Sequence, residues 1–152
     1  MFIQINEIES VLNSAEWVFP FFECVHIAGF AVAIGTIALV DFTLLGAGLQ
    51  REKAPQLLED MAPWTLVGLA MVLISGPILF LTDADKYLFD RSFRIKMTCL
   101  ALALLFNYTF HNKAARSASS GVAKLAAGAS LLLWVLVVGS GIFIAYLGTA
   151  GG

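Results

Sequence analysis

The stretch VHIAGFAVAIGTIALVDF, residues 25–42, decides the fold class of this chain. Between His26 and Asp41, every residue except Thr36 is apolar or glycine. A helix of about 20 predominantly apolar residues is long enough to cross the hydrocarbon core of a bilayer. The stretch therefore predicts a transmembrane helix. It also raises a question, because imidazole and carboxylate groups inside a membrane span are costly and are often functional.

The composition of the whole chain agrees with a membrane protein. Of its 152 residues, 59% are hydrophobic and only 13% are charged, and the mean hydropathy is +0.85. Soluble domains are about half apolar and about a quarter charged, and a chain this short cannot bury so much apolar surface in a water-facing fold. Lipid must therefore cover the excess. The formal net charge of −2 gives no indication of a nucleic-acid partner.

Four segments are apolar enough to span a bilayer. They cover about residues 17–49, 63–81, 93–111 and 125–147. Pro63 is expected in the first turn of the second span, and Ser75-Gly76-Pro77 is expected to kink it. The polar connections QREKAPQLLED, TDADKYLFDRS and NKAARSASSG are short, so sequential spans are expected to run antiparallel.

Residues 1–16 carry apolar side chains at helical spacing with acids between them. This pattern is typical of an amphipathic helix that lies at the membrane surface. The predicted fold for residues 1–152 is therefore all-α: a single membrane domain, built as an up-down four-helix bundle with a short interfacial helix at the N-terminus.

The distribution of cations predicts an orientation. The loops after the first and third spans carry five cations, which are Arg51, Lys53, Lys113, Arg116 and Lys124. The opposite side carries Lys86 and Arg91, with Arg94 and Lys96 just entering the third span. Because cytoplasmic loops are enriched in Lys and Arg, this excess predicts a multi-pass protein of the bacterial inner membrane with both termini on the periplasmic side.

Polar residues form two layers in the predicted bundle. His26 and Asp41 are 15 residues apart, so they lie roughly 22 Å apart along the helix and roughly 60° apart around it. Lys96 and His111 repeat this spacing in the third span, which runs in the same direction. His26 and Lys96, with Arg94 nearby, are thus expected near the outer face. Asp41 and His111, with Asn107 and Tyr108, are expected near the inner face.

The inner layer has a structural and a functional interpretation. In the structural one, Asp41 hydrogen-bonds His111 or pairs with Arg51 and fixes helix register near the interface. In the functional one, Asp41, Asn107 and His111 form a proton or quinone site. Lys96 of the outer layer has a structural interpretation too, in which its ammonium group reaches outward to the interface.

His26 is either a hydrogen-bonded core histidine or a ligand, because neutral imidazole is the commonest metal-binding side chain. Haem b needs one or two axial side chains and an apolar slot. The small residues of Gly29–Gly35 could supply the slot or serve helix packing, and Arg94 or Lys96 could neutralise the propionates. His111 lies about 20 Å away in depth, so a sixth ligand would be Met97 or Lys96.

Copper is the alternative metal. Cys24, His26, Met97 and Cys99 have similar predicted depths, and soft ligands suit Cu(I). Positions two apart on a helix point about 200° apart, so Cys24 and His26 cannot both face one ion, and the same holds for Met97 and Cys99. His26 with one residue of the third span remains a candidate set. Without CxxC spacing, the cysteines are expected to pack as small hydrophobes.

The segments HIAGFAVAIGTIALVDFTLLG and FRIKMTCLALALLFNYTFHNKAAR resemble a group of uncharacterised four-span bacterial inner-membrane proteins. More distantly, they resemble the copper-resistance D family and the HemJ-type protoporphyrinogen oxidases. The matching positions are His26, the Gly29–Gly35 face, Lys96, Asn107 and His111, within a likeness that covers most of residues 18–147. The resemblance implies haem b bound by the bundle in the HemJ-like case, and copper entry or handling in the other.

The sequence therefore predicts a small cytochrome-b-like membrane protein that passes electrons or senses redox state. His26 would be an axial ligand of haem b, and Arg94 and Lys96 would neutralise its propionates. The alternatives are a copper-handling membrane protein and a structural subunit of a membrane complex. The expected partners are membrane lipid, a quinone or a redox protein, and further copies of this chain or other subunits. No phosphate loop, HExxH motif or nucleophile elbow occurs.

Overall fold

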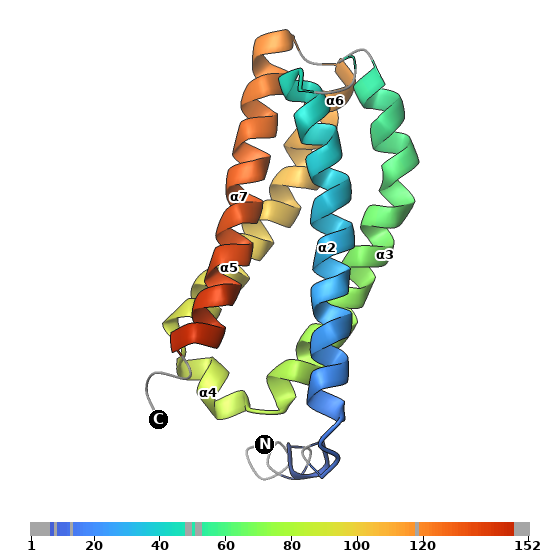
Figure 1. The fold of residues 1–152 in the computed structure, drawn as a ribbon. Helices are drawn as coiled ribbons and strands as arrows, with labels where there is room; N and C mark the ends of the chain where they lie inside the picture. The colour runs from blue at the N-terminus through green and yellow to red at the C-terminus, as the bar shows by residue number, and fades with distance from the viewer. Residues whose placement is uncertain are drawn as a thin grey trace. The chain divides into compact units, whose positions relative to one another are not determined.

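The computed structural model describes residues 7, 9–12, 14–47, 50, 53–117 and 119–147, and all regular secondary structure in these residues is helical (Figure 1). This confirms the all-α prediction. The elements are α2 (Val18–Leu45), α3 (Ala54–Leu81), α4 (Ala84–Phe89), α5 (Arg91–Phe106), the π-helical turn η2 (Asn107–His111), α6 (Asn112–Ser117) and α7 (Ser120–Leu147). The helix predicted at residues 1–16 lies partly outside the described residues, of which 7 and 9–12 are helical.

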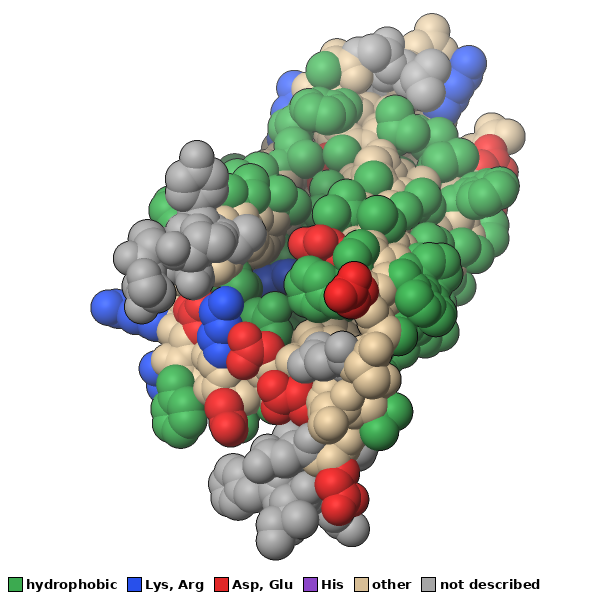
Figure 2. All heavy atoms as spheres, turned by 60° about the horizontal axis from the view of Figure 1, so that its bottom comes forward, with side chains coloured by type: hydrophobic (Ala, Val, Ile, Leu, Met, Phe, Trp, Pro, Cys, Tyr) green, Lys and Arg blue, Asp and Glu red, His purple; other side chains and the backbone are tan. Residues whose placement is uncertain are grey.

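Three of the described helices are long and apolar enough to cross a membrane, namely Val18–Leu45, Ala54–Leu81 and Ser120–Ile144. Their outward surface is apolar, with Ile74 on α3 and Leu132 on α7 each more than half exposed. Figure 2 shows one face of the molecule, on which hydrophobic side chains cover much of the helical surface. Apolar surface on this scale is what contact with lipid requires, so the chain has the character of a membrane protein.

The second predicted span begins nine residues too late. α3 starts at Ala54, so Pro63 lies inside the helix, and the prediction that it occupies the first turn is wrong. Pro55 occupies the first turn instead, where its missing N–H costs nothing. The stretch expected to be a polar loop is helical because Leu57 and Leu58 pack against a buried apolar cluster. The expected kink at Pro77 stays a prediction.

The third predicted span, residues 93–111, is helical but irregular. α5 ends at Phe106 after 16 residues, η2 follows, and α6 continues to Ser117. α5 is therefore not among the three candidate spans, and a fourth membrane crossing stays a prediction. A π-helical turn inside a helix is rare and often marks a functional site.

The chain divides into two compact units, and each unit contains one part of α2 and one part of α3. The first unit comprises residues 1–35 and 63–89, and here α2 and α3 pack closely through glycines. A Cβ on Gly68 would lie 2.5 Å from the backbone nitrogen of Ala33, and one on Gly29 would lie 2.8 Å from the Cβ of Met71. Part of the small-residue face of α2 thus serves helix packing.

The second unit comprises residues 36–62 and 90–152. Four helical segments share its buried apolar cluster: α2, α3, α6 and α7. Its fully or nearly buried members are Val40, Leu44, Ala54, Ala115, Ala123 and Ala127. α5 packs along α7 in this unit. Alanine dominates the cluster, so the backbones approach closely and leave little space around any polar side chain that they enclose.

Candidate functional site

A buried pair, Asp41 and His111, lies in the second unit. Asp41 comes from the last turns of α2 and His111 from the end of η2. His111 Nε2 lies 2.6 Å from Asp41 Oδ1, which is a hydrogen-bond distance. Asp41 is 0% exposed and His111 is 1% exposed. The structure therefore confirms the predicted contact between these two residues. The alternative partner of Asp41, Arg51, lies outside the described residues.

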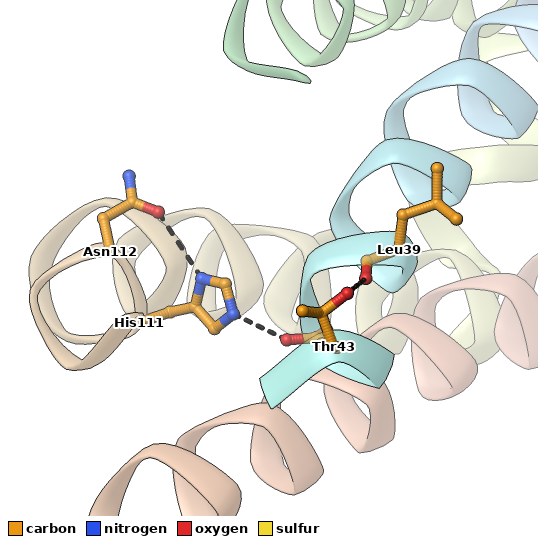
Figure 3. Close-up of polar contacts among 5 residues, drawn as sticks. Leu39, Thr43, His111 and Asn112 are labelled. Atoms are coloured by element: carbon orange, nitrogen blue, oxygen red, sulfur yellow. Dashed lines mark hydrogen bonds and ion pairs between the residues drawn. The ribbon is translucent and has the colours of Figure 1, made fainter. Parts of the chain in front are cut away.

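The second ring nitrogen of His111 faces another oxygen. Nδ1 lies 3.4 Å from Oδ1 of the neighbouring Asn112, a long contact (Figure 3). Asn112 is half-buried, so the ring links the fully buried carboxyl group to the margin of the core. Because both ring nitrogens face oxygen atoms, His111 has no nitrogen directed at a metal ion.

Several buried side-chain oxygen atoms of this unit have no hydrogen-bond partner. In the described part of the chain they are Asp41 Oδ2, Ser130 Oγ and Asn107 Oδ1. Ser130, on α7, lies beside the Asp41 carboxyl group but outside hydrogen-bonding geometry. Asn107 lies on the same π-helical turn as His111 and is 5% exposed. Buried polar atoms are nearly always satisfied, so three in one unit mark this region as the candidate site.

His26 lies in the first unit, where its ring is held from two sides. His26 Nδ1 lies 2.8 Å from Oγ of Ser75 on α3. The Ser75 hydroxyl donates to the backbone oxygen of Met71 at 2.6 Å, so its one hydrogen is already used. Ser75 must then accept from His26 Nδ1–H, which places the lone pair of the neutral ring on Nε2. Phe30 meets the imidazole edge to face, with ring centroids 5.0 Å apart.

A glycine gives this imidazole its space. A Cβ on Gly76 would lie 3.3 Å from Cε1 of His26, closer than most side chains tolerate. Ser75 and Gly76 therefore both position His26. Ser75 accepts its hydrogen bond, and Gly76 has no side chain that would collide with the ring. Sequence reasoning assigned both residues only to a kink. The signal that could have identified Ser75 is a hydroxyl in an otherwise apolar span, next to a glycine.

The cations expected to accompany His26 belong to the second unit. Arg94 is exposed, Met97 is 47% exposed, and Lys96 is half-buried. Lys96 Nζ lies 3.6 Å from the position that a Cβ of Gly141 on α7 would take. The combined site of His26 with these three residues joins the two units, so it stays a prediction.

The candidate copper set of His26 with Met97 or Cys99 also joins the two units, so it stays a prediction. Cys24 is exposed and Cys99 is half-buried, and both are free thiols. Among the described residues, no group of three or more His, Cys, Asp or Glu side chains is arranged to hold a metal ion.

Comparison with known proteins assigns the family. A model of a family of unknown function, DUF6644, matches residues 15–147. The chain belongs to the DUF6644 family. The match includes the His26–Ser75 contact of the first unit. It also includes Asp41, His111 and Ser130 of the second unit.

The other comparisons add no relative. No curated protein and no solved structure matches the chain. The expected resemblance to an uncharacterised family agrees with the family match. The more distant resemblance to the copper-resistance D and HemJ-type families is not shown by any comparison, and it stays a prediction.

Proposed function

We propose that this DUF6644 protein is a small membrane-embedded haem-b-binding protein that transfers electrons or senses redox state. It would be a multi-pass, up-down four-helix bundle in the bacterial inner membrane, with both termini periplasmic. Three long apolar helices support the membrane location. The observation that carries the haem proposal is the 2.8 Å contact between His26 Nδ1 and Ser75 Oγ, because the Ser75 hydroxyl already donates to Met71 and so favours a proton on Nδ1.

The surroundings of His26 fit an axial ligand. Histidines that bind a metal almost always donate their other ring N–H to a fixed acceptor, which sets the ring orientation and increases the basicity of the ligating nitrogen. Ser75 supplies this acceptor, and its hydroxyl is itself fixed by Met71. Haem, when bound, would supply one-electron chemistry at iron. Arg94 and Lys96 remain the residues proposed for the propionates, and Met97 or Lys96 for the sixth ligand.

The chain contains only two histidines, which makes the assignment easy to test. His26 is the histidine that we assign as ligand, because Ser75 holds its Nδ1 and Phe30 packs against its ring. Purified in detergent from cells supplied with haem precursor, the protein should show a Soret band. His26→Ala should abolish this band, and His111→Gln should retain it. Ser75→Ala should retain haem but weaken its affinity by about 10- to 100-fold, as loss of such supporting contacts usually does.

Three other results would overturn the proposal. A Soret band that persists in His26→Ala would exclude His26 as the ligand. Copper found by elemental analysis in place of haem, and lost in His26→Ala, would favour the copper-handling alternative. If neither cofactor is found and His26→Ala lowers only thermal stability, the protein is a structural subunit in which His26 and Ser75 hold α2 against α3.

A further inference from the structure

The carboxyl group of Asp41 is buried in a way that a bare carboxylate does not tolerate. Oδ1 contacts His111, but Oδ2 has no hydrogen-bond partner and is enclosed by protein. A buried charge is costly unless it is paired and its oxygens are hydrogen-bonded. Either a positive charge balances the group or a proton neutralises it.

Among the residues that the structure describes in the second unit, the other charged side chains are exposed or lie near the start of α5. In its described residues, Lys53, Glu59, Asp60, Lys113, Arg116 and Lys124 are exposed, and Tyr108 is half exposed. Glu59 and Arg116 already pair with each other at 2.7 Å. Asp90, Arg91, Arg94 and Lys96 lie on the first turns of α5, at least 15 residues or roughly 22 Å before His111. His111 is therefore the one titratable group in direct contact with Asp41 in these residues.

We propose that Asp41 and His111 form a membrane-embedded proton-binding site, in which Asp41 carries an exchangeable proton on the Oδ1–Nε2 axis. In the protonated state, Asp41 Oδ1–H donates to Nε2, and Nδ1–H points toward Asn112. The pair is then neutral, as its burial requires. Ser130 lies beside the same carboxyl group. This inference does not depend on haem.

The imidazole supplies the route for the proton. In the deprotonated state, Nε2–H donates to the carboxylate, and the lone pair is on Nδ1 toward Asn112. A proton that arrives from water at Nδ1 forms an N–H bond there. The proton on Nε2 then passes to Oδ1, forming the O–H bond of Asp41 and restoring the Nε2 lone pair. The half-buried Asn112 marks the side from which water would reach the ring.

The buried residues around the pair favour a proton over a larger ligand such as a quinone. One turn beyond Asp41 and His111 lies the buried cluster that includes Leu44 and Ala115. One turn before Ser130 on α7 lies Ala127 of the same cluster, and one turn after it lies Trp134, which is 2% exposed. A quinone would have to displace these side chains. His111 lies on a π-helical turn, and such turns occur frequently at functional sites.

Infrared difference spectroscopy of the full-length protein in nanodiscs tests the proposal. The spectrum at neutral pH should contain the carbonyl band of a protonated carboxylic acid, and alkaline pH should remove it. Asp41→Asn should abolish the band. The matched control is Asp60→Asn, which removes an exposed acid from α3 in the same unit and should leave the band unchanged. In case Asp41→Asn does not fold, wild-type protein with carbon-labelled aspartate side chains should show the band shifted.

A second measurement tests whether His111 relays the proton to Asp41. After transfer to heavy water, the band should shift as deuterium replaces the proton, and His111→Gln should slow this exchange several-fold while retaining the band. An equal exchange rate in both proteins would exclude the relay. Absence of any pH-dependent carboxylic acid band from aspartate would overturn the proton site. Loss of the band on adding sodium chloride, but not choline chloride, at constant pH would replace the proton with a sodium ion.

Discussion

Gly68 lies where the backbones of α2 and α3 come closest, and no side chain fits there. A Cβ at this position would lie 2.5 Å from the nitrogen of Ala33 and 2.7 Å from the oxygen of Gly29. Both are backbone atoms and cannot rotate away. We expect Gly68→Ala to destabilise the protein by about 1–3 kcal/mol, because the helices must separate. Thermal unfolding in detergent measures this.

Gly35 provides the control for this prediction. It also lies within a helix, but a Cβ there would have nothing within 4 Å. Alanine is a better helix former than glycine by up to about 1 kcal/mol, so Gly35→Ala should be neutral or stabilising. If the two variants change the unfolding temperature equally, close packing at Gly68 is not the reason for the glycine.

At the residue scale, the sequence predicted one polar contact well. The equal 15-residue spacing in two helices of the same direction brought Asp41 and His111 to one depth, and the structure places them in contact. Ser130 and Ser75 were missed. Spacing along one helix gives depth and relative azimuth, but it does not say which face of a neighbouring helix lies opposite. A single serine in an apolar helix therefore has no identifiable partner before the fold is known.

The element boundaries show which local interactions decide where a helix begins. Asp90 caps α5, and its Oδ1 accepts from the backbone N–H of Ser92 at 2.6 Å and of Phe93 at 3.4 Å. Removal of an aspartate N-cap typically costs about 1 kcal/mol. We expect Asp90→Ala to speed amide hydrogen exchange at Ser92 and Phe93 and to lower stability by about that amount, whereas Asp90→Ser should restore most of it.

A nearby aspartate gives the comparison for the cap. Asp83 lies in the same connection but makes only an exposed contact of 3.9 Å with Lys86, of a kind that contributes little. Asp83→Ala should leave exchange at the start of α5 unchanged. If both substitutions accelerate it equally, general loosening of the connection is responsible, and the cap has no specific role.

Helix existence was predictable at this scale, and helix limits were less so. In the described residues, each of the four apolar segments is helical over most of its length, because length and hydropathy are strong signals. α3 extends back to Ala54 because Leu57 and Leu58 find a buried cluster built from other helices. The π-helical turn at Asn107–His111 has no local sequence signature; it packs against α7, and its His111 contacts Asp41.

At the scale of the whole molecule, composition predicted the environment but not the assembly. A short chain with this hydropathy requires lipid, and three described helices can cross a bilayer. The number of crossings depends on α5, whose 16 residues and irregular continuation carry a weaker apolar signal. The two sites predicted from the sequence differ in how far the structure tests them. The inner polar pair lies within one unit, whereas the proposed haem site needs residues from both.

The exposed apolar surface of α7 offers the sharpest test that lipid surrounds this chain. Leu132, near the middle of the helix, is 61% exposed, and Leu125, near its N-terminal end, is 76% exposed. In water, replacing either by arginine would be harmless. At the centre of a membrane span, an arginine costs about 2.5–3.5 kcal/mol, whereas one near the end reaches the interface with its charged group. We expect Leu132→Arg to reduce sharply the protein recovered in alkali-washed membranes, and Leu125→Arg to have little effect. Equal recovery of the two variants would mean that lipid does not cover this face of α7.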